Sequence, residues 1–402
     1  MSIEEYTDFN IKNGVLVSFE GVCENLQIPD GVTEIGERAF KKGKLIRRVF
    51  IPDGVEVIDE YAFSGCEWLE KVRLPESLKR IEYSAFRGCK SLEIINFPQS
   101  LEYVCEDAFY NTAWLKRAKK NDVYINDIFY HHYEKQNEVQ VKDGTRIIAP
   151  EAFYNKNGNP PNTWLIEKII LPDSLEIIGY EAFRGAENLI EIEIPNSVKS
   201  IGSGVFSHTG LKEIKLPDSI KTIGRYVFAH SDLNQIDFPK GIDTIPEGMF
   251  ESCMSLTEIE IPEGVKILGR NVFIYCRNLK EVALPNSLEV IDFQAFAFCE
   301  SLKKIVIPGN IKEIPNFAFE KSGLEEVVFE GSLSDINSRI PGSCSPFYGC
   351  KSLKTLTFTG NCGKFNNKLF KECPMIKTVR AKKGTYPEIY AENHGFAFEP
   401  LD

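Results

Sequence analysis

Apolar and polar positions recur along this chain with a period of about 22 or 23 residues. One unit runs from Leu69 to Phe86, and within it Leu69, Val72 and Leu74 alternate with charged residues, which is typical of a short strand with one buried face. Pro75 follows, and it ends the strand because proline lacks the N–H group that a ladder of strands requires. Each unit therefore begins with one short, half-buried strand.

The second half of each unit returns the chain to the core and ends in phenylalanine. The repeat phenylalanines are Phe40, Phe63, Phe86, Phe109, Phe153, Phe183, Phe206, Phe228, Phe250, Phe273, Phe296, Phe319, Phe347 and Phe370. A repeat of this length indicates a solenoid, in which one coil buries its apolar side only against its neighbours. We predict a right-handed, strand-rich solenoid of about 14 coils, with short helical or 3₁₀ turns, curved into a horseshoe or arc.

Two stretches have the pattern of a β-hairpin instead of a coil. In residues 1–28 the apolar residues Ile11 and Val15 flank Asn13-Gly14, a strong hairpin turn signal, and we predict an N-terminal capping hairpin there. Residues 122–142 repeat that pattern, because the chain from 122 onward aligns without gaps with the chain from residue 9 onward. We therefore predict an inserted hairpin module that replaces one coil.

The end of the chain departs from the repeat as well. A short helix from Pro387, stopped by Gly395, followed by a last strand, gives a predicted C-terminal cap at residues 382–402. Coils at residues 29–121 and 143–381 then complete what we expect to be one continuous solenoid domain.

Most of the 11 cysteines follow the repeat. Their shared slot lies three residues after a repeat phenylalanine, where other coils place glycine, alanine, serine or threonine. The cysteines of this slot are Cys66, Cys89, Cys253, Cys276, Cys299, Cys350 and Cys373. The slot accepts small side chains, so we predict a ladder of buried thiols, with disulfides or a metal site as the alternatives.

The repeated blocks resemble a known family. The blocks that carry the resemblance are IPDGV…IG…AF at 51–63 and 261–273 and LP-S-L at 74–78 and 284–288, together with the Asn-Gly hairpin and the terminal Tyr-Ala-Glu-Asn-x-Gly segment. Over nearly its whole length the chain is similar to BspA-like leucine-rich repeat proteins. The resemblance implies a β-rich, α/β-type leucine-rich repeat solenoid from a bacterium, often placed at the cell surface, with a role in adhesion or protein binding.

Charge and hydropathy narrow the function further. A net charge of −11 leaves no basic face for nucleic acid, and no run approaches 18 consecutive apolar residues, so we expect no transmembrane segment. The first residues, MSIEEYTDFN, lack a basic and apolar export signal. The chain as it stands is therefore expected in the cytoplasm, or at the cell surface or secreted if an export signal has been removed.

Motifs of catalysis and metal binding are missing from the sequence. It has no nucleophile elbow, phosphate-binding loop or HExxH motif, so we predict a protein without catalytic residues or cofactor. His208 and His230 occupy the same slot in adjacent coils, which brings them together, yet a zinc site needs three or four ligands and no third is evident. We therefore predict no metal site.

The outward positions of the predicted strands are the main candidates for binding. Stacked coils lie about 4.8 Å apart, so equivalent residues form columns along the solenoid. The columns are basic at the start, with Arg48, Lys71 and Arg73. In the middle they are acidic, with Glu191, Glu193, Asp237, Glu258, Glu260 and Glu281. Stacked like charges destabilise a sheet, so we predict that the acidic strip binds a cationic partner surface, the alternative being a solvated face.

The inserted hairpin carries a second candidate surface. Its aromatic residues are Tyr124, Phe129, Tyr130 and Tyr133. They either contact a partner or pack the hairpin against the neighbouring coil. The sequence thus predicts non-catalytic binding of a protein, or of a surface glycan, by a chain expected to be a monomer; a structural spacer without a specific ligand is the competing interpretation.

Overall fold

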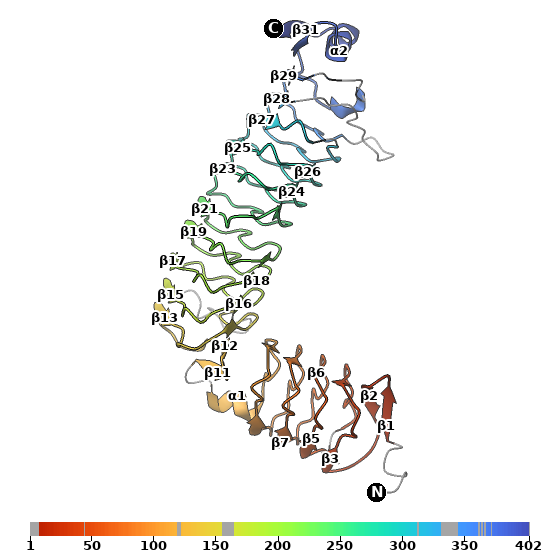
Figure 1. Ribbon diagram of the computed structural model, residues 1–402, viewed down its shortest axis with the longest axis vertical. Coiled ribbons are helices and arrows are strands. Elements are labelled where there is room, and N and C mark those ends of the chain that lie inside the picture. The colour runs from red at the N-terminus through yellow and green to blue at the C-terminus, as the bar shows by residue number, and fades with distance from the viewer. Residues whose placement is uncertain are drawn as a thin grey trace. The chain divides into compact units, whose positions relative to one another are not determined.

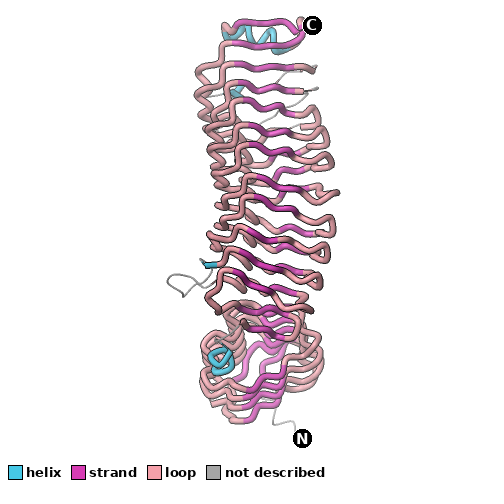
Figure 2. Tube along the Cα trace, turned by 90° about the vertical axis from the view of Figure 1, so that its left-hand side faces the viewer, coloured by secondary structure: helices cyan, strands magenta, loops and turns pink. Residues whose placement is uncertain are grey.

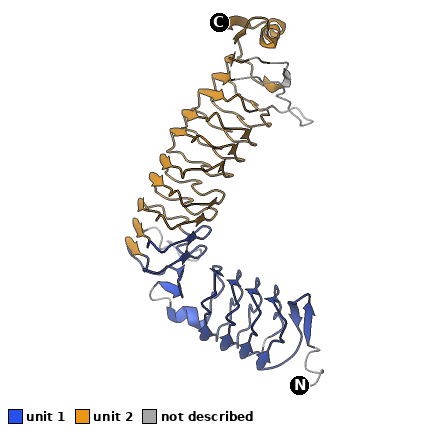
Figure 3. Ribbon diagram, in the orientation of Figure 1, with its two compact units in different colours: residues 1–136, 141–162, 172–182 blue, residues 137–140, 163–171, 183–402 orange. Residues whose placement is uncertain are grey.

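The computed structural model describes residues 8–43, 45–118, 122–154, 165–311, 313–330, 345–360, 362, 365, 367–370 and 372–401. The contacts group the chain into two compact units, whereas the sequence suggested one continuous domain (Figure 1, Figure 3). Unit 1 comprises residues 1–136, 141–162 and 172–182, and unit 2 comprises residues 137–140, 163–171 and 183–402.

Both units are stacks of coils, and each coil of the regular repeat contributes two short strands, each of which pairs in parallel with its equivalent in the neighbouring coil (Figure 2). The strand that precedes the proline is called the face strand here, and the two-residue strand that follows is called the return strand. In unit 1 the face strands are β3 (Asn25–Gln27), β5 (Arg48–Phe50), β7 (Lys71–Arg73) and β9 (Ile94–Asn96). The return strands of unit 1 are β4 (Glu34–Ile35), β6 (Val57–Ile58), β8 (Arg80–Ile81), β10 (Tyr103–Val104), β14 (Ile147–Ile148) and β16 (Ile177–Ile178).

Unit 2 repeats this arrangement over more coils. Its face strands begin with β13 (Glu138–Gln140), β15 (Lys168–Ile170), β17 (Glu191–Ile192), β19 (Glu213–Lys215), β21 (Gln235–Asp237), β23 (Glu258–Glu260) and β25 (Glu281–Ala283). Its return strands are β18 (Ser200–Ile201), β20 (Thr222–Ile223), β22 (Thr244–Ile245), β24 (Ile267–Leu268) and β26 (Val290–Ile291). A continuous five-stranded sheet follows: β27 (Lys304–Ile307), β28 (Glu326–Phe329), β29 (Thr355–Phe358), β30 (Thr378–Lys382) and β31 (Ala397–Leu401).

The face strands show the alternation that the sequence predicts. In β7 the side chain of Val72 is buried, while Lys71 and Arg73 on either side are exposed. Neighbouring face strands pair in parallel and without a shift, so that Lys71 lies beside Ile94 of the next coil. Outward residues at equivalent positions therefore form continuous columns.

The repeat phenylalanines form stacked rows in the interior. Phe63 and Phe86 in unit 1 are fully buried, with ring centroids 5.1 Å apart and planes 2° from parallel. Phe273 and Phe296 in unit 2 stack in the same way at 5.3 Å. The prediction of a solenoid with coils in register is thus confirmed.

A third ladder of hydrogen bonds runs along the phenylalanine side of the coils. The N–H groups of Tyr61, Phe63 and Gly65 donate to carbonyl oxygens of the next coil at 3.0, 2.8 and 2.8 Å. Residues two before and two after each repeat phenylalanine mostly have positive φ, for example Tyr61 at 55° and Tyr275 at 61°. This alternation aims successive N–H groups in one direction, toward the following coil. We call this row the Phe-side ladder.

The cysteine slot is a row of buried, reduced thiols, as predicted for the residues that the structure describes. Each thiol donates to the carbonyl oxygen of the repeat phenylalanine in the preceding coil, as Cys276 does to Phe250 at 3.0 Å. A hydroxyl in the same slot instead bonds within its own coil, as Ser231 does to Phe228 at 2.7 Å. Burial raises the pKa of these thiols, to about 12 for Cys66 and Cys253.

Hairpins and helices stand where the coil pattern changes. β1 (Phe9–Lys12) pairs antiparallel with β2 (Val15–Phe19), and β11 (Val123–Ile125) pairs antiparallel with β12 (Ile128–His131). The helical elements among the described residues are α1 (Ala113–Ala118), the 3₁₀ helix η3 (Asn367–Phe370) and α2 (Tyr386–His394).

α2 ends at Gly395, where φ is 69° and the N–H group closes the helix end. Among the helices in the described ranges, none has the length and apolar character needed to cross a membrane.

Candidate functional site: the outward face of the face strands

Three cations without a counter-charge lie together on the face strands of unit 1. Arg48 and Lys71 are register partners at the first position of β5 and β7, and Phe50 and Arg73 are partners at the third position. The Arg73 guanidinium lies 4.8 Å from the centroid of the Phe50 ring. Among the described residues, no carboxylate lies within 4.0 Å of these three cations. We call these four residues the basic grid.

Charges beside the basic grid are compensated across coils. Arg47 donates to Glu70 of the next coil at 2.7 Å and lies 3.8 Å from Glu24 of the preceding coil. Lys90 pairs with Glu67 at 2.7 Å. The basic grid therefore departs from the local rule that a charge meets its opposite one coil away.

In unit 2 both ends of the strand face follow that rule. Lys168 forms an ion pair with Glu191, its register partner in the next coil. Toward the other end Lys304 pairs with Glu326 at 3.0 Å, and Arg380 pairs with Glu399 at 2.6 Å. These pairs join neighbouring face strands, so they neutralise the columns at those positions.

In the middle of the unit 2 face, charges are not compensated by an opposite charge one coil away. Glu258 and Glu281 are register partners at the first position of β23 and β25, and Glu260 and Ala283 are partners at the third position. All four side chains are exposed, and in the described part of the chain no cation is paired with these carboxylates. We call these four residues the acidic grid. Neighbouring like charges on a sheet repel each other, which leaves the grid open to a cationic ligand.

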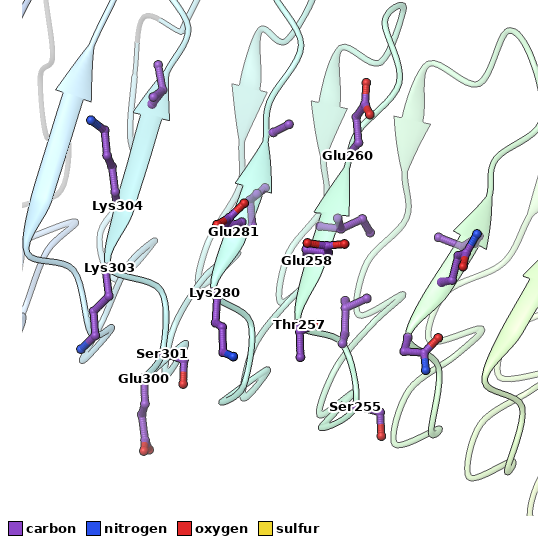
Figure 4. A pocket seen from close by; sticks show the side chains of 18 residues that line it. Ser255, Thr257, Glu258, Glu260, Lys280, Glu281, Glu300, Ser301, Lys303 and Lys304 are labelled. Atoms are coloured by element: carbon purple, nitrogen blue, oxygen red, sulfur yellow. The ribbon is translucent and has the colours of Figure 1, made fainter.

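The acidic grid borders a shallow hollow on this face, with a volume of about 1460 Å³ (Figure 4). Lys280 and Lys303 form a separate row at the start of the strands, next to the carboxylates. This lysine row is not among the surfaces predicted from the sequence. The signal was present, because both lysines hold the position directly before the face strand in successive coils.

The remaining residues of the predicted acidic strip have different surroundings. Glu191 is committed to its ion pair with Lys168. Asp237 is exposed and lies beside Lys215, its register partner in the preceding coil. Glu193 is exposed and follows the end of β17. The structure therefore brings together only Glu258, Glu260 and Glu281 as one group.

The aromatic residues of the inserted hairpin lie mostly in the core. Phe129 is fully buried and stacks on Phe153 at 4.8 Å, and Tyr130 is buried with its hydroxyl oxygen accepting the N–H of Phe109 at 3.4 Å. Neither residue can touch a partner while the unit is folded, so this part of the predicted surface is corrected. The physical reason is that the hairpin packs its rings into the interior rows.

Tyr124 and Tyr133 are half-buried. The Tyr124 hydroxyl accepts the N–H of Lys142 at 3.0 Å, which ties the hairpin to the chain that follows it. Burial raises the pKa of both phenols. Both side chains are partly exposed, and the hydrogen bond of Tyr124 and the ring contact of Tyr133 with His131 are both made within the chain.

Unit 1 contains a buried polar cluster that has no sequence signature. The Cys105 thiol donates to the Glu106 carboxylate at 2.8 Å, and the Tyr180 hydroxyl donates to the same oxygen. Burial, the carboxylate charge and its hydrogen bond raise the pKa of Cys105. A thiol held protonated is a poor nucleophile, so the cluster is suited to linking coils and not to covalent chemistry.

The two histidines of the shared slot meet as expected. The rings of His208 and His230 stack with centroids 4.6 Å apart and planes 5° from parallel. Glu251 lies 3.8 Å from His230. Within the described ranges there is no group of three or more residues suited to hold a metal ion.

Two solved structures are similar to this chain. A leucine-rich repeat protein from Bacteroides ovatus is 22% identical, with a TM-score of 0.50, over 98% of this chain and 97% of that one. A leucine-rich cell surface protein from Faecalibacterium prausnitzii is 20% identical, with a TM-score of 0.37, over 95% of this chain and 94% of that one. At 22% identity, the likeness to the Bacteroides ovatus protein shows the fold alone.

No curated protein matches the sequence. The model of the BspA type leucine rich repeat region matches residues 18–134, 161–280 and 266–392, in six copies. These matches cover most of the chain, and they fall on the stacked coils described above. The chain therefore belongs to the BspA-type leucine-rich repeat family.

Proposed function

We propose that this protein binds a protein partner, without catalysis, through the strand face of unit 2. The observation that carries the proposal is the acidic grid, three exposed carboxylates beside a hollow on a rigid sheet. At both ends of the same face, ion pairs between coils neutralise the charges. A partner with cationic side chains would supply the missing counter-charge, and association would be fast and sensitive to salt.

The scaffold suits this role. The ladder of hydrogen bonds fixes the backbone beneath these side chains, so a partner has to order the side chains but not the strands. The family resemblance adds adhesion as the setting for such binding, in which the partner is a protein or glycan at a cell surface. A structural spacer makes the opposite prediction, that no defined partner is retained.

The test is affinity capture with the full chain as bait, from bacterial and host-cell extracts, with retained proteins identified by mass spectrometry. The variant Glu258→Lys/Glu260→Lys/Glu281→Lys is compared with a control that carries the same charge change away from the face, Glu187→Lys/Glu289→Lys/Glu392→Lys. We expect the face variant to lose a defined partner that the control retains. Equal capture by both variants would remove the acidic face as the binding surface.

A further inference from the structure

We propose that the basic grid and the acidic grid bind each other between two copies of this chain. The basic grid on unit 1 of one copy lies against the acidic grid on unit 2 of the other, with the stacking directions of the two units antiparallel. The inference rests on the proposed function, because it uses the acidic grid as a binding surface and names the partner.

The two grids have the same dimensions. Each consists of the first and third residues of two adjacent face strands that pair in parallel and in register. Adjacent strands lie about 4.8 Å apart, and residues two positions apart on a strand are separated by about 6.6 Å. Charges of one grid can therefore be placed opposite charges of the other without distortion of either sheet.

The arrangement of charges within the grids is complementary as well. Two faces of this kind oppose each other when one is rotated by 180° about the strand direction, which reverses the order of the coils and keeps the direction of the strands. The rotation brings together these pairs: Arg48 with Glu281, Lys71 with Glu258, Arg73 with Glu260, and Phe50 with Ala283. All three cations meet carboxylates, and the apolar corner of one grid meets the apolar corner of the other.

The flanking row is compatible with this pairing. One position before the strands, Glu24 comes opposite Lys303, but Glu24 already lies 3.8 Å from Arg47 and Lys303 already lies 3.7 Å from Glu325. Arg47 comes opposite Lys280, but the Arg47 guanidinium is already held by Glu70 at 2.7 Å. The attractive and the like-charge meeting of this row thus both involve groups that already have partners, so the row neither adds to nor opposes the pairing of the grids.

A second copy is favoured as the occupant because every copy carries both grids. Within one chain the two patches lie on different units, and both lack ion pairs. Copies of a chain with a net charge of −11 repel each other overall. They can therefore associate only where opposite charges meet locally, as they do in the three ion pairs between the grids. Such an interface is screened by salt.

The experiment is sedimentation velocity of the full chain over a concentration series, at about 50 mM and about 500 mM salt. We expect self-association at low salt and at least tenfold weaker association at high salt. The variants Arg48→Glu/Lys71→Glu/Arg73→Glu and Glu258→Lys/Glu260→Lys/Glu281→Lys should each weaken self-association at least tenfold.

Control variants with equal charge changes elsewhere are Lys12→Glu/Lys41→Glu/Lys142→Glu and Glu187→Lys/Glu289→Lys/Glu392→Lys. Both should associate more strongly than the corresponding grid variant. Circular dichroism and the thermal midpoint establish that each variant is folded.

Restoring the complementarity gives the sharpest readout. The chain with all six grid substitutions has its charges exchanged and its net charge unchanged, and it should associate like the original. The two grid variants, monomeric alone, should form a complex when mixed. A chain that stays monomeric at low salt, or a failure of both the exchange and the mixture to associate, overturns the inference.

The outcome for the proposed function is read separately. A foreign protein that binds the acidic grid is still captured by Arg48→Glu/Lys71→Glu/Arg73→Glu, whereas a second copy is not. A monomeric chain that retains such a protein would overturn the self-association and leave the proposed function standing. If the chain binds neither a foreign protein nor a second copy, both the proposed function and the self-association are overturned.

Discussion

The interior rows and the strand face belong to the same coils, yet they follow opposite rules. In the interior, one residue type occupies one position from coil to coil: phenylalanine rings stack at 4.4 to 6.0 Å, and small side chains fill the slot behind them. On the strand face, equivalent positions change from cation to carboxylate to apolar. Packing tolerates little change because every coil must fit its two neighbours, while an exposed column is free to vary.

The difference teaches where stability and specificity lie in this fold. Substitutions in the interior rows should change the free energy of unfolding, and substitutions on the face should change binding. The four predictions below test this division, in order of decreasing effect.

Removal of one ring from the interior should have the largest effect. Phe273 is fully buried between Phe250 and Phe296, at 5.3 Å from each. Phe273→Ala should lower the free energy of unfolding by about 3–5 kcal/mol, because the ring leaves a cavity that its neighbours cannot fill. Denaturant titration measures this change. The face variant Glu258→Ala is the matched control, with an expected change within about 0.5 kcal/mol; equal losses would contradict the division.

Alkaline pH should weaken the interior through its thiols. Burial raises the pKa of Cys350 to about 11 and of Cys66 and Cys253 to about 12, whereas an unfolded thiol ionises near pH 8.5. A raised folded pKa means that the stabilisation is complete below about pH 8.5 and is lost as the pH rises toward the folded value.

We therefore expect unfolding midpoints in urea to be constant from about pH 7 to 8 and to fall from about pH 9 to 11. The variant Cys253→Ala should show a shallower fall, because it has one thiol fewer to ionise. An identical slope in both chains would contradict the assignment of the fall to buried thiols.

One substitution in the interior should raise the free energy of unfolding instead of lowering it. Ser84 is fully buried with φ of 54°, and its hydroxyl has no hydrogen-bond partner among the described residues. Ser84→Gly should raise the free energy of unfolding by about 1 kcal/mol, because glycine adopts positive φ without a steric penalty and the orphaned hydroxyl is removed. Ser84→Ala keeps the strained backbone and should fall between the two in denaturant titration. A Ser84→Gly chain less stable than the original would show that the hydroxyl has a structural role.

An ion pair at the edge of the face should matter least. Glu70 accepts from Arg47 at 2.7 Å, and both side chains are 42% exposed. Glu70→Gln should change the free energy of unfolding by about 0.5 kcal/mol or less, and less still in high salt, because exposed pairs are weak and screened. Thermal melts at two salt concentrations measure it. A loss comparable to that of Phe273→Ala would show that the face carries stability after all.

Much of the fold was predictable because the period repeats many times. The strand alternation around Val72, the chain reversal after Pro75 and the buried phenylalanine rows all follow from residue type and spacing. The exceptions are informative too. Where Glu330 and Thr359 replace proline, the N–H groups that they supply bond to the preceding coils at 2.9 and 3.0 Å. β28 and β29 extend to four residues there.

Other features could not be predicted, for physical reasons. Positive φ at Tyr61 or Tyr275 carries no glycine signal, because the inter-coil hydrogen bonds impose that backbone conformation. The residue types of Phe129 and Tyr130 do not by themselves show whether these rings face solvent or the core. The ion pair between Lys168 and Glu191 depends on side-chain conformation, and it removed one member of the predicted acidic strip.

The Phe-side ladder gives every stack of coils a direction. In the described coils its N–H groups point toward the C-terminal end of the stack and its carbonyl oxygens point toward the N-terminal end. The two ends of a stack therefore differ chemically, one with unpaired donors and the other with unpaired acceptors. The leading tip of a run of coils must find an outside acceptor, and where the inserted hairpin interrupts the coils the phenolic oxygen of Tyr130 accepts from the N–H group of Phe109. Coils can be duplicated or deleted in the middle without altering either tip, so the length of such a protein is free to change over evolution while its two terminators are kept.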